Sequence, residues 1–311
     1  MSYFIGIDGG GSKTEAAIGD EQRVLARVTV PSCKVQAVGE ERARAALHQA
    51  LAEACRAAGI VPAQLARGVI GVSGFSRAGV ADWLRARASE LTTADIEVVG
   101  DNAIAYAAAF GDAPGVLVIA GTGSIAFGRN AKGDTARAGG WGPLISDEGS
   151  GTWIGREAVR QAMRAADRGD APALLADIMG AWQVTAREAV ASAANQQPAP
   201  DLAALFPLVL RQAEAGDKIA TEILAQAASQ LAQLARDVVT RLFASESAEV
   251  AVAGGVFASA ATVRQIFRKT LQNLCPAVRV QDAMVEPVLG ALAMARRSAG
   301  HSSAGGGTPT Q

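Results

Sequence analysis

Three glycine-rich turns are the first features of the sequence that could do chemistry. They lie at residues 9–11, 121–123 and 254–255, and each follows a short run rich in β-branched residues. A glycine turn at the end of a strand can hold several backbone N–H groups against an anion, because glycine adopts unusual backbone angles and lets a ligand approach closely. Neither the P-loop spacing nor the dinucleotide fingerprint occurs at a strand-to-helix junction. The turns therefore indicate a phosphate clamp of another kind.

Asp101 is the most informative acidic residue, because it stands between a predicted strand at 96–99 and a predicted helix that ends near residue 110. An aspartate in this place can cap the helix or act as a general base, and the sequence leaves both roles open. Only two histidines, His48 and His301, are present. The chemistry must therefore fall to carboxylates, hydroxyls, backbone amides and a bound metal.

The elements that must position these residues alternate between strands and helices. A length of 311 residues suggests about two domains. The predicted strands are at 3–8, 15–18, 24–30, 69–72, 96–99, 115–120, 125–128, 250–252 and 278–280, and the predicted helices at 40–58, 78–88, 101–110, 260–273 and 288–297. A mainly helical stretch, broken at 196–200, covers 153–243. The strand–turn–strand pattern of the start recurs after residue 115. This recurrence predicts an α/β fold in which the second part repeats the pattern of the first.

Composition narrows the class of partner. The net charge is −1 and no tract of lysine or arginine occurs, which argues against nucleic acid and anionic membranes as partners. No apolar run approaches the ~18 residues of a spanning helix, and the start lacks the features of a signal peptide. Cys33, Cys55 and Cys275 form neither a disulfide framework nor a metal-binding spacing. We expect a cytoplasmic protein with reduced thiols and a small-molecule partner.

The motifs together resemble a known family. The stretch 5–14 (IGIDGGGSKT), with 120–124 (AGTGS), 139–142 (GGWG), 146–151 (SDEGSG) and 253–256 (AGGV), is similar to the BadF/BadG/BcrA/BcrD ATPase family of the actin/hexokinase/Hsp70 superfamily, and within it to the N-acetylglucosamine kinases. The resemblance implies two RNase-H-like α/β domains with ATP in the cleft between them. It places the first domain at 1–112 together with the helix 286–297, and the second, with a helical insertion, at 113–285. Residues 298–311 are expected to be a disordered tail.

The resemblance also implies roles for individual residues. Asp101 would be the general base and Asp8 would help to hold hydrated Mg²⁺. The nucleotide would be bound by Gly10, Gly11, Ser12, Lys13, Thr14, Gly121, Thr122, Gly123, Gly254 and Gly255. The sugar would be bound by Lys34, Ser73, Gly74, Asp101, Ser124, Gly140, Trp141, Gly142 and Asp147. Two alternatives remain open in this set: Asp147 or Glu148 could cap the helix near Trp153, and Trp141 could pack at a hinge.

Lys34 is the clearest departure from the family pattern. Relatives that phosphorylate N-acetylglucosamine carry an asparagine at this place in the loop before the first helix, and Ile125 likewise stands where some relatives have asparagine. Lys34 could line the sugar pocket, or its long side chain could extend into solvent. The identity of the sugar is therefore open.

The implied activity is ATP-dependent phosphorylation of an amino sugar, with N-acetylglucosamine and its 6-phosphate as the expected substrate and product. Glucosamine and N-acetylmuramate are the alternative substrates, and relatives suggest a homodimer. A second branch of the family comprises ATP-driven activators of 2-hydroxyacyl-CoA dehydratases, which need cysteine ligands for an iron–sulfur cluster. Ser124 follows the second glycine turn and no cysteine lies between Cys55 and Cys275, so the sequence favours the kinase. A DNA-binding sugar sensor is disfavoured because no helix pair precedes Tyr3.

Overall fold

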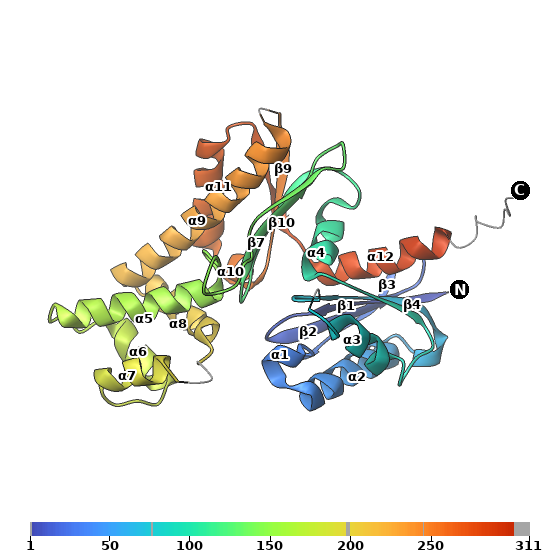
Figure 1. Cartoon of the computed structure of the whole chain (residues 1–311), viewed down its shortest axis with the longest axis horizontal. Coiled ribbons are helices and arrows are strands. Elements are labelled where there is room, and N and C mark those ends of the chain that lie inside the picture. The colour runs from blue at the N-terminus through green and yellow to red at the C-terminus, as the bar shows by residue number, and fades with distance from the viewer. Residues whose placement is uncertain (1, 76, 197–199, 245, 302–311) are drawn as a thin grey trace, which may run out of the picture. The chain divides into compact units, whose positions relative to one another are not determined.

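The chain folds into two α/β units, each built on a five-stranded sheet with the same connectivity. The computed structural model describes residues 2–75, 77–196, 200–244 and 246–301 (Figure 1). Unit 1 comprises Met1–Ala113 and Val285–Gln311, and unit 2 comprises Pro114–Met284. The sheet orders are β3-β2-β1-β4-β5 and β8-β7-β6-β9-β10. In each sheet the first three strands along the chain pair antiparallel, and the next two strands are parallel to the first. The pattern that recurs in the sequence therefore corresponds to a repeated fold.

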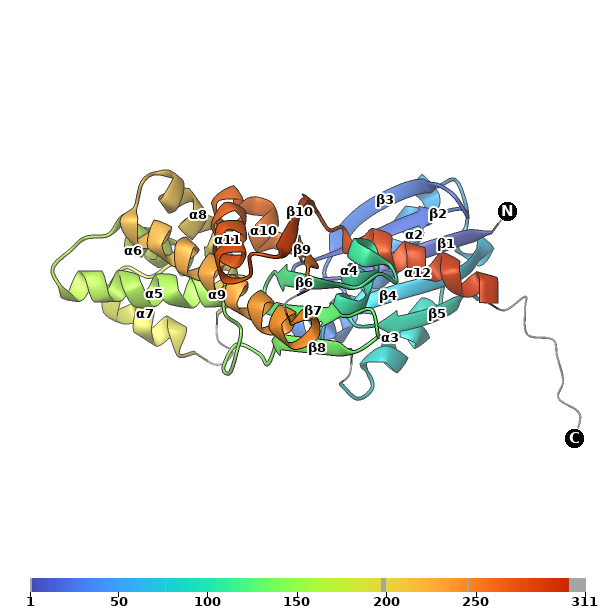
Figure 2. The same cartoon turned by 90° about the horizontal axis from the view of Figure 1, so that it is seen from above.

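The sheet of unit 1 has β1 at its centre. Its strands are β1 (Tyr3–Gly9), β2 (Lys13–Gly19), β3 (Val24–Pro31), β4 (Leu65–Val72) and β5 (Asp95–Val99). Its helices are α1 (Val35–Val38), α2 (Glu40–Ala57), α3 (Val80–Ala88), α4 (Asp101–Phe110) and α12 (Pro287–His301), with a 3₁₀ turn at Pro62–Gln64. Figure 2 shows α4 and α12 together on one side of this sheet.

Both faces of β1 are buried, and this explains its nearly continuous apolar sequence. Ile5 and Ile7 point into a core shared with α2 and α3, whereas Phe4 points into a second core shared with α4 and α12. Gly6 lies on the α12 face, where a Cβ atom would stand 2.3 Å from the backbone nitrogen of Leu292. The last helix of the chain therefore docks closely on the first strand, and α12 belongs to unit 1.

Unit 2 repeats the sheet and adds helices. Its strands are β6 (Gly115–Ala120), β7 (Ser124–Arg129), β8 (Thr135–Gly139), β9 (Ala248–Ala253) and β10 (Val278–Met284). Its helices are α5 (Gly151–Asp167), α6 (Ala173–Ala181), α7 (Arg187–Ala194), α8 (Phe206–Glu214), α9 (Lys218–Phe243), α10 (Gly255–Ser259) and α11 (Ala261–Leu274), with a 3₁₀ turn at Leu202–Leu205.

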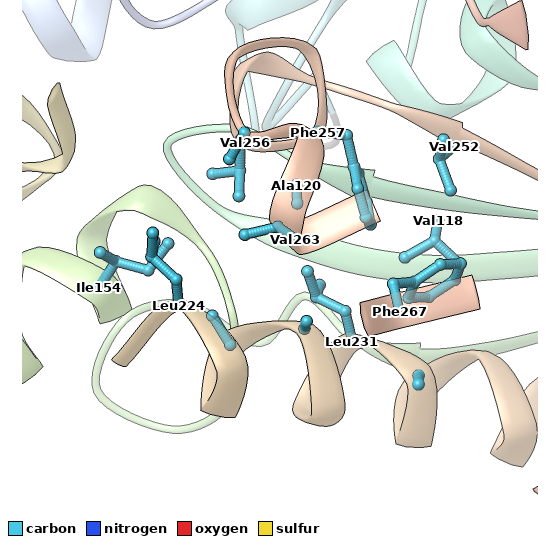
Figure 3. Close-up of a cluster of buried hydrophobic side chains, with 14 of the residues drawn as sticks. Val118, Ala120, Ile154, Leu224, Leu231, Val252, Val256, Phe257, Val263 and Phe267 are labelled. Atoms are coloured by element: carbon cyan, nitrogen blue, oxygen red, sulfur yellow. The ribbon is translucent and has the colours of Figure 1, made fainter. Parts of the chain in front are cut away.

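The core of unit 2 fixes the ends of the strands that carry its glycine turns. Val118 and Ala120 of β6 lie in one apolar cluster with Phe257 of α10, Phe267 of α11 and Leu231 of α9 (Figure 3). The rings of Phe257 and Phe267 meet edge to face with centroids 5.2 Å apart. A rigid layer of this kind holds the turns after β6 and β9 in place.

The structure confirms most of the predicted elements and corrects others. β8 and α10 were not predicted, and α12 continues beyond residue 297 to His301. The remaining residues of the expected tail, 302–311, lie outside the described residues. All three cysteines are free thiols. In the part of the chain that the structure describes, no helix combines the length and the apolar character needed to cross a membrane.

Candidate active site

Asp8 and Glu15 face each other across the first glycine turn. They are direct partners in the antiparallel pairing of β1 with β2. Like charges placed directly opposite each other in a sheet are destabilising. No side-chain hydrogen bond reaches the Asp8 carboxylate within the described residues, and Lys13 instead forms an ion pair with Glu15. This strand pair therefore keeps an electrostatically unfavourable arrangement at the place where a function was predicted.

The docking of α4 brings Asp101 to the same place. Gly71 of β4 is the partner of Asp8 on the other side of β1, and Ile104 of α4 occupies the space above Gly71. Asp101 lies one helical turn before Ile104 and so shares its face of the helix. The helix cap is Gly100, while the Asp101 carboxylate accepts the N–H of Asn102 at 2.9 Å. Asp101 is thus not the N-cap residue, and its carboxylate stays available beside Asp8.

The pKa values of these carboxyls reflect burial and mutual repulsion. Burial, Asp101 and Glu15 together raise the pKa of Asp8 to about 7, although Lys13 opposes the shift. Burial also raises the pKa of Asp101, against the N–H of Asn102 and the ammonium of Lys34. A cation would relieve this repulsion. Mg²⁺ is usually held by one or two carboxylates plus waters and phosphate oxygens, so Asp8 fits the role expected for it.

Hydrogen bonds tie the first glycine turn to the loop that follows β3. The Ser32 hydroxyl donates to the carbonyl of Gly10 at 2.7 Å, and the Thr14 hydroxyl accepts the N–H of Cys33 at 2.8 Å. Thr14 is fully buried, so its side chain holds the turn to the loop and does not face solvent. Ser12 and Lys13 are exposed, and they are the residues of this turn that can meet a ligand.

Lys34 lies in the same loop, and its side chain turns inward. Its ammonium donates to the Ser73 hydroxyl at 2.7 Å, and the N–H of Lys34 donates to the Ser32 hydroxyl at 3.1 Å. Burial lowers the pKa of Lys34, the nearby Asp101 raises it, and Arg77 lowers it. Lys34 is therefore half-buried and bonded to Ser73, and its side chain does not extend into solvent. Ser73 and exposed Gly74, which has a φ of 76°, follow β4 on the same side as Asp101.

The second glycine turn joins β6 to β7. Thr122 and Gly123 are exposed, and a Cβ at Gly121 would meet no atom within 4 Å. Ser124 is buried and donates its hydroxyl to the carbonyl of Glu148 at 2.8 Å. The turn thus presents Gly121, Thr122 and Gly123 outward, while Ser124 holds it to the unit.

Asp147 is also buried, with 5% of its surface exposed. Its carboxylate accepts the N–H of Ser124 and the hydroxyl of Ser150, both at 2.8 Å. Ser150, which is itself the N-cap of α5, accepts the N–H of Trp153 at 3.0 Å. Burial raises the pKa of Asp147, and these hydrogen bonds oppose the shift. Asp147 therefore supports the helix cap without being the cap.

The loop from Gly140 to Ser146 carries exposed apolar side chains. Trp141 is 60% exposed and lies under the Arg137 guanidinium, 3.7 Å from the centre of the ring. The loop folds on itself through the N–H of Trp141, which donates to the carbonyl of Ser146 at 3.1 Å. Trp141 thus presents an open aromatic surface within unit 2, supported by a cation on its other face.

The two glycines of the third glycine turn, Gly254 and Gly255, have different surroundings. A Cβ at Gly254 would stand 2.3 Å from the carbonyl oxygen of Ala120, and its φ of 98° suits glycine. A Cβ at Gly255 would meet no atom within 4 Å. Gly254 is therefore required by the turn itself, and Gly255 leaves open space at the start of α10.

Two surface cavities do not coincide with these residues. A cavity of about 580 Å³ lies between α2 and α3 and is lined by His48 and Trp83, among others. Another, of about 290 Å³, lies between α11 and the strand β10. None of their lining residues belongs to the predicted set, and the arginines of the second cavity are bonded to neighbouring carbonyls and to Asp282. The chemistry of the site is therefore assigned from the turns and carboxylates.

Comparison with known proteins decides the family. The BadF/BadG/BcrA/BcrD ATPase family matches residues 5–295. The chain belongs to this family. It is 31% identical to the N-acetylmuramic acid/N-acetylglucosamine kinase of Clostridium acetobutylicum, over 95% of the chain and 99% of that protein. It is 30% identical to the N-acetyl-D-glucosamine kinase of Dictyostelium discoideum, over 95% and 98% of the two lengths.

A solved structure from Chromobacterium violaceum, assigned provisionally as an N-acetylglucosamine kinase, superimposes with a TM-score of 0.73. It is 25% identical in sequence, and the match covers 94% of this chain and 99% of that one. The predicted fold class, two α/β domains of the actin-like ATPase type, is thereby confirmed.

For this BadF/BadG/BcrA/BcrD ATPase, the sequence did not predict the residues that hold the turns of the site through hydrogen bonds. Ser32 and Ser150 each accept and donate hydrogen bonds at a turn, yet neither was predicted. Glu15 was likewise not singled out, although it faces Asp8. Its position opposite Asp8 could have been found by pairing the two predicted strands across the turn. Ser150 lies within the motif 146–151, whereas nothing in the sequence marks Ser32.

Proposed function

We propose that the protein is an ATP-dependent amino-sugar kinase that converts N-acetylglucosamine to N-acetylglucosamine 6-phosphate. The observation that carries this proposal is the Asp101 carboxylate, which is half-buried near Asp8 and Lys34 at the start of α4 and accepts the N–H of Asn102. The curated relatives support the choice of sugar, since both are named as kinases of N-acetylated amino sugars.

In the proposed reaction Asp101 accepts the proton of the sugar hydroxyl as the hydroxyl oxygen attacks the γ-phosphorus of ATP. The new P–O bond forms while the bond to the β,γ-bridging oxygen breaks, and ADP leaves. The raised pKa of Asp101 makes it a stronger base than an exposed aspartate, and the ammonium of Lys34 opposes this rise by favouring the charged carboxylate. When bound, Mg²⁺ neutralises charge on the phosphates, with Asp8 as its protein ligand.

The glycine turns bind the nucleotide in this proposal. Ser12, Lys13 and the N–H groups of Gly10 and Gly11 contact phosphate oxygens, with Thr14 beneath them. Gly121, Thr122 and Gly123 supply a second set of phosphate donors. The open space at Gly255 admits the nucleoside, as expected for the turn that Gly254 shapes.

This proposal keeps the sugar-binding roles that the resemblance implies for Gly140, Trp141, Gly142 and Asp147 and for Lys34, Ser73 and Gly74. Ser124 lends support through its backbone. These assignments rest on the family resemblance, and Gly140 and Trp141 are exposed, whereas Asp147 and Ser124 are buried. The finer expectations of Mg²⁺ dependence, a homodimer and a cytoplasmic location belong to the same proposal. Metal titration, light scattering in solution and cell fractionation test them separately.

A second substrate, N-acetylmuramate, is favoured by the charge at Lys34. The ammonium is held by Ser73 with the Arg77 guanidinium near it. If this part of unit 1 binds the sugar, these two cations suit a lactyl carboxylate and oppose the protonated amine of glucosamine. Turnover measured with each of the three sugars, ATP being saturating, tests the order: the acetylated sugars should be used and glucosamine should be poor.

A further inference from the structure

The start of α5 is fastened to the second glycine turn by several hydrogen bonds. The N–H of Gly151 donates to the carbonyl of Gly121 at 2.8 Å. Both the N–H and the hydroxyl of Thr152 donate to the carbonyl of Thr122, at 3.2 and 2.8 Å. The carbonyls of Gly121 and Thr122 therefore point toward the start of α5. The side of the turn away from α5 faces outward.

The Asp147 carboxylate completes this attachment from the other end of the turn. One oxygen accepts the N–H of Ser124, and the other accepts the hydroxyl of Ser150. A Cβ at Gly123 would stand only 3.1 Å from the first of these oxygens. The carboxylate therefore lies directly behind the turn, and the Ser150 hydroxyl fixes its orientation.

The segment that holds Asp147 and Ser150 is continuous with the loop from Gly140 to Ser146, which carries proposed sugar-binding residues and is called the sugar loop below. Gly142 and Ser146 form a β-bridge, and Asp147 is the next residue. At the other end of the loop, a Cβ at Gly140 would stand 2.9 Å from the side chain of Ile125, which follows Ser124. Both ends of the sugar loop therefore meet the residues that end the glycine turn.

We propose that Ser150 and Thr152 are positioning residues that, with Asp147, set the glycine turn of residues 121–124 against the sugar loop. Neither hydroxyl is free for substrate, because each is used inside unit 2. The proposal rests on the proposed function for the identity of the two ligands. It adds that the geometry of the phosphate donors depends on the hydrogen bond between Ser150 and Asp147.

The test compares nucleotide binding in variants that remove one hydroxyl each. Ser150→Gly removes the bond to Asp147 and still allows a helix start, since glycine is a tolerated N-cap. Thr152→Val removes the second hydroxyl with little change in size. Asp217→Gly is the matched control. Asp217 caps α9 through the N–H of Ala220, and within the described part of the chain its side chain forms no hydrogen bond with the turn.

Calorimetric titration with ADP should show affinity reduced about 3- to 10-fold in Ser150→Gly and in Thr152→Val, the effect of one lost hydrogen bond, and unchanged in Asp217→Gly. Hydrogen exchange at the Ser124 amide should be faster in Ser150→Gly than in Asp217→Gly. In an Asp147→Ala background, which has no side-chain acceptor for the Ser150 hydroxyl, Ser150→Gly should cause no further loss.

Equal loss of affinity in Asp217→Gly would overturn the proposal, since capping in general would then explain it. Unchanged affinity and exchange in Ser150→Gly would overturn it as well. If the unaltered chain binds ADP but no sugar stimulates turnover, the proposed function fails while the positioning role is still judged by these titrations. If the unaltered chain binds no nucleotide, both fail together.

Discussion

The ammonium of Lys34 donates a hydrogen bond to the hydroxyl of Ser73 at 2.7 Å, and this contact joins two loops that are 39 residues apart in the chain. The lysine is thereby kept in the neighbourhood of Asp101, whose charge raises its pKa against the effect of burial. A family position expected to carry a neutral amide thus carries a fixed cation in this protein.

Replacing Lys34 by asparagine should change which sugar is preferred. Without the cation, kcat/KM for glucosamine relative to N-acetylglucosamine should rise about tenfold, which corresponds to ~1.4 kcal/mol, and any use of N-acetylmuramate should fall. Steady-state kinetics on the three sugars measures both ratios. Lys132→Asn, at an exposed site in unit 2, is the control and should leave them unchanged. Ratios equal to those of the unaltered protein would place Lys34 outside the sugar site.

Asp101→Asn should reduce turnover by about 10²–10⁴-fold, the usual contribution of a general base. The substitution keeps the size of the side chain and can still accept the N–H of Asn102. Because the helix cap is Gly100, the melting temperature at pH 7 should not fall. Near-normal turnover combined with a lower melting temperature would show that Asp101 serves the helix and not the reaction.

Asp8→Asn should stabilise the protein at pH 8 and not at pH 4. The native pKa of about 7 lies above the ordinary value of 3.8, so between these limits the native state retains a proton that the unfolded chain has released. The contribution of Asp8 to the free energy of unfolding therefore falls as the pH rises from about 4 to about 7. The variant removes that loss, and its melting temperature at pH 8 should be higher by about 3 °C or more.

Thermal unfolding at the two pH values measures this effect. Asp82→Asn, whose side chain is 86% exposed, is the control and should show no such difference. Added Mg²⁺ should raise the melting temperature of the unaltered protein at pH 8 more than that of Asp8→Asn. A variant that is less stable at both pH values would contradict the repulsion inferred between Asp8, Glu15 and Asp101.

Gly121→Val should weaken nucleotide binding without disturbing the fold. The new side chain meets no protein atom within 4 Å of its Cβ, so it enters only the space assigned to phosphate. ADP affinity should fall at least about tenfold, as measured by calorimetry. Gly180→Val, at another exposed glycine with open space around it, should bind ADP normally. Equal affinities in both variants would remove this turn from the nucleotide site.

Much of this architecture follows from local patterns in the sequence. The buried strand β1 reads as an apolar run, and the turns after β1, β6 and β9 are visible as clusters of glycine. Of these glycines, Gly254 has a positive φ that favours this residue. Asp101 was found because a strand, a short junction and a helix follow one another. These features depend on residues that are neighbours in the chain.

The parts that escaped prediction depend on contacts that are distant in sequence or on weak local signals. β8 is a five-residue edge strand with exposed Thr135 and Arg137, so its apolar alternation is poor. α10 has only five residues and starts within the glycine turn. The hydrogen bonds of Lys34 with Ser73 and of Asp147 with Ser124 join segments that meet only after folding.

The most direct test of the proposed function is sugar-stimulated release of ADP. The unaltered protein, with ATP and Mg²⁺, should release ADP when N-acetylglucosamine is added, and phosphorus NMR should identify the product as the 6-phosphate. Asp101→Asn should bind ADP with unchanged affinity and release almost none. Absence of stimulation by N-acetylglucosamine, glucosamine, N-acetylmuramate, N-acetylmannosamine and glucose, in a protein that binds ATP, would contradict the assignment as an amino-sugar kinase.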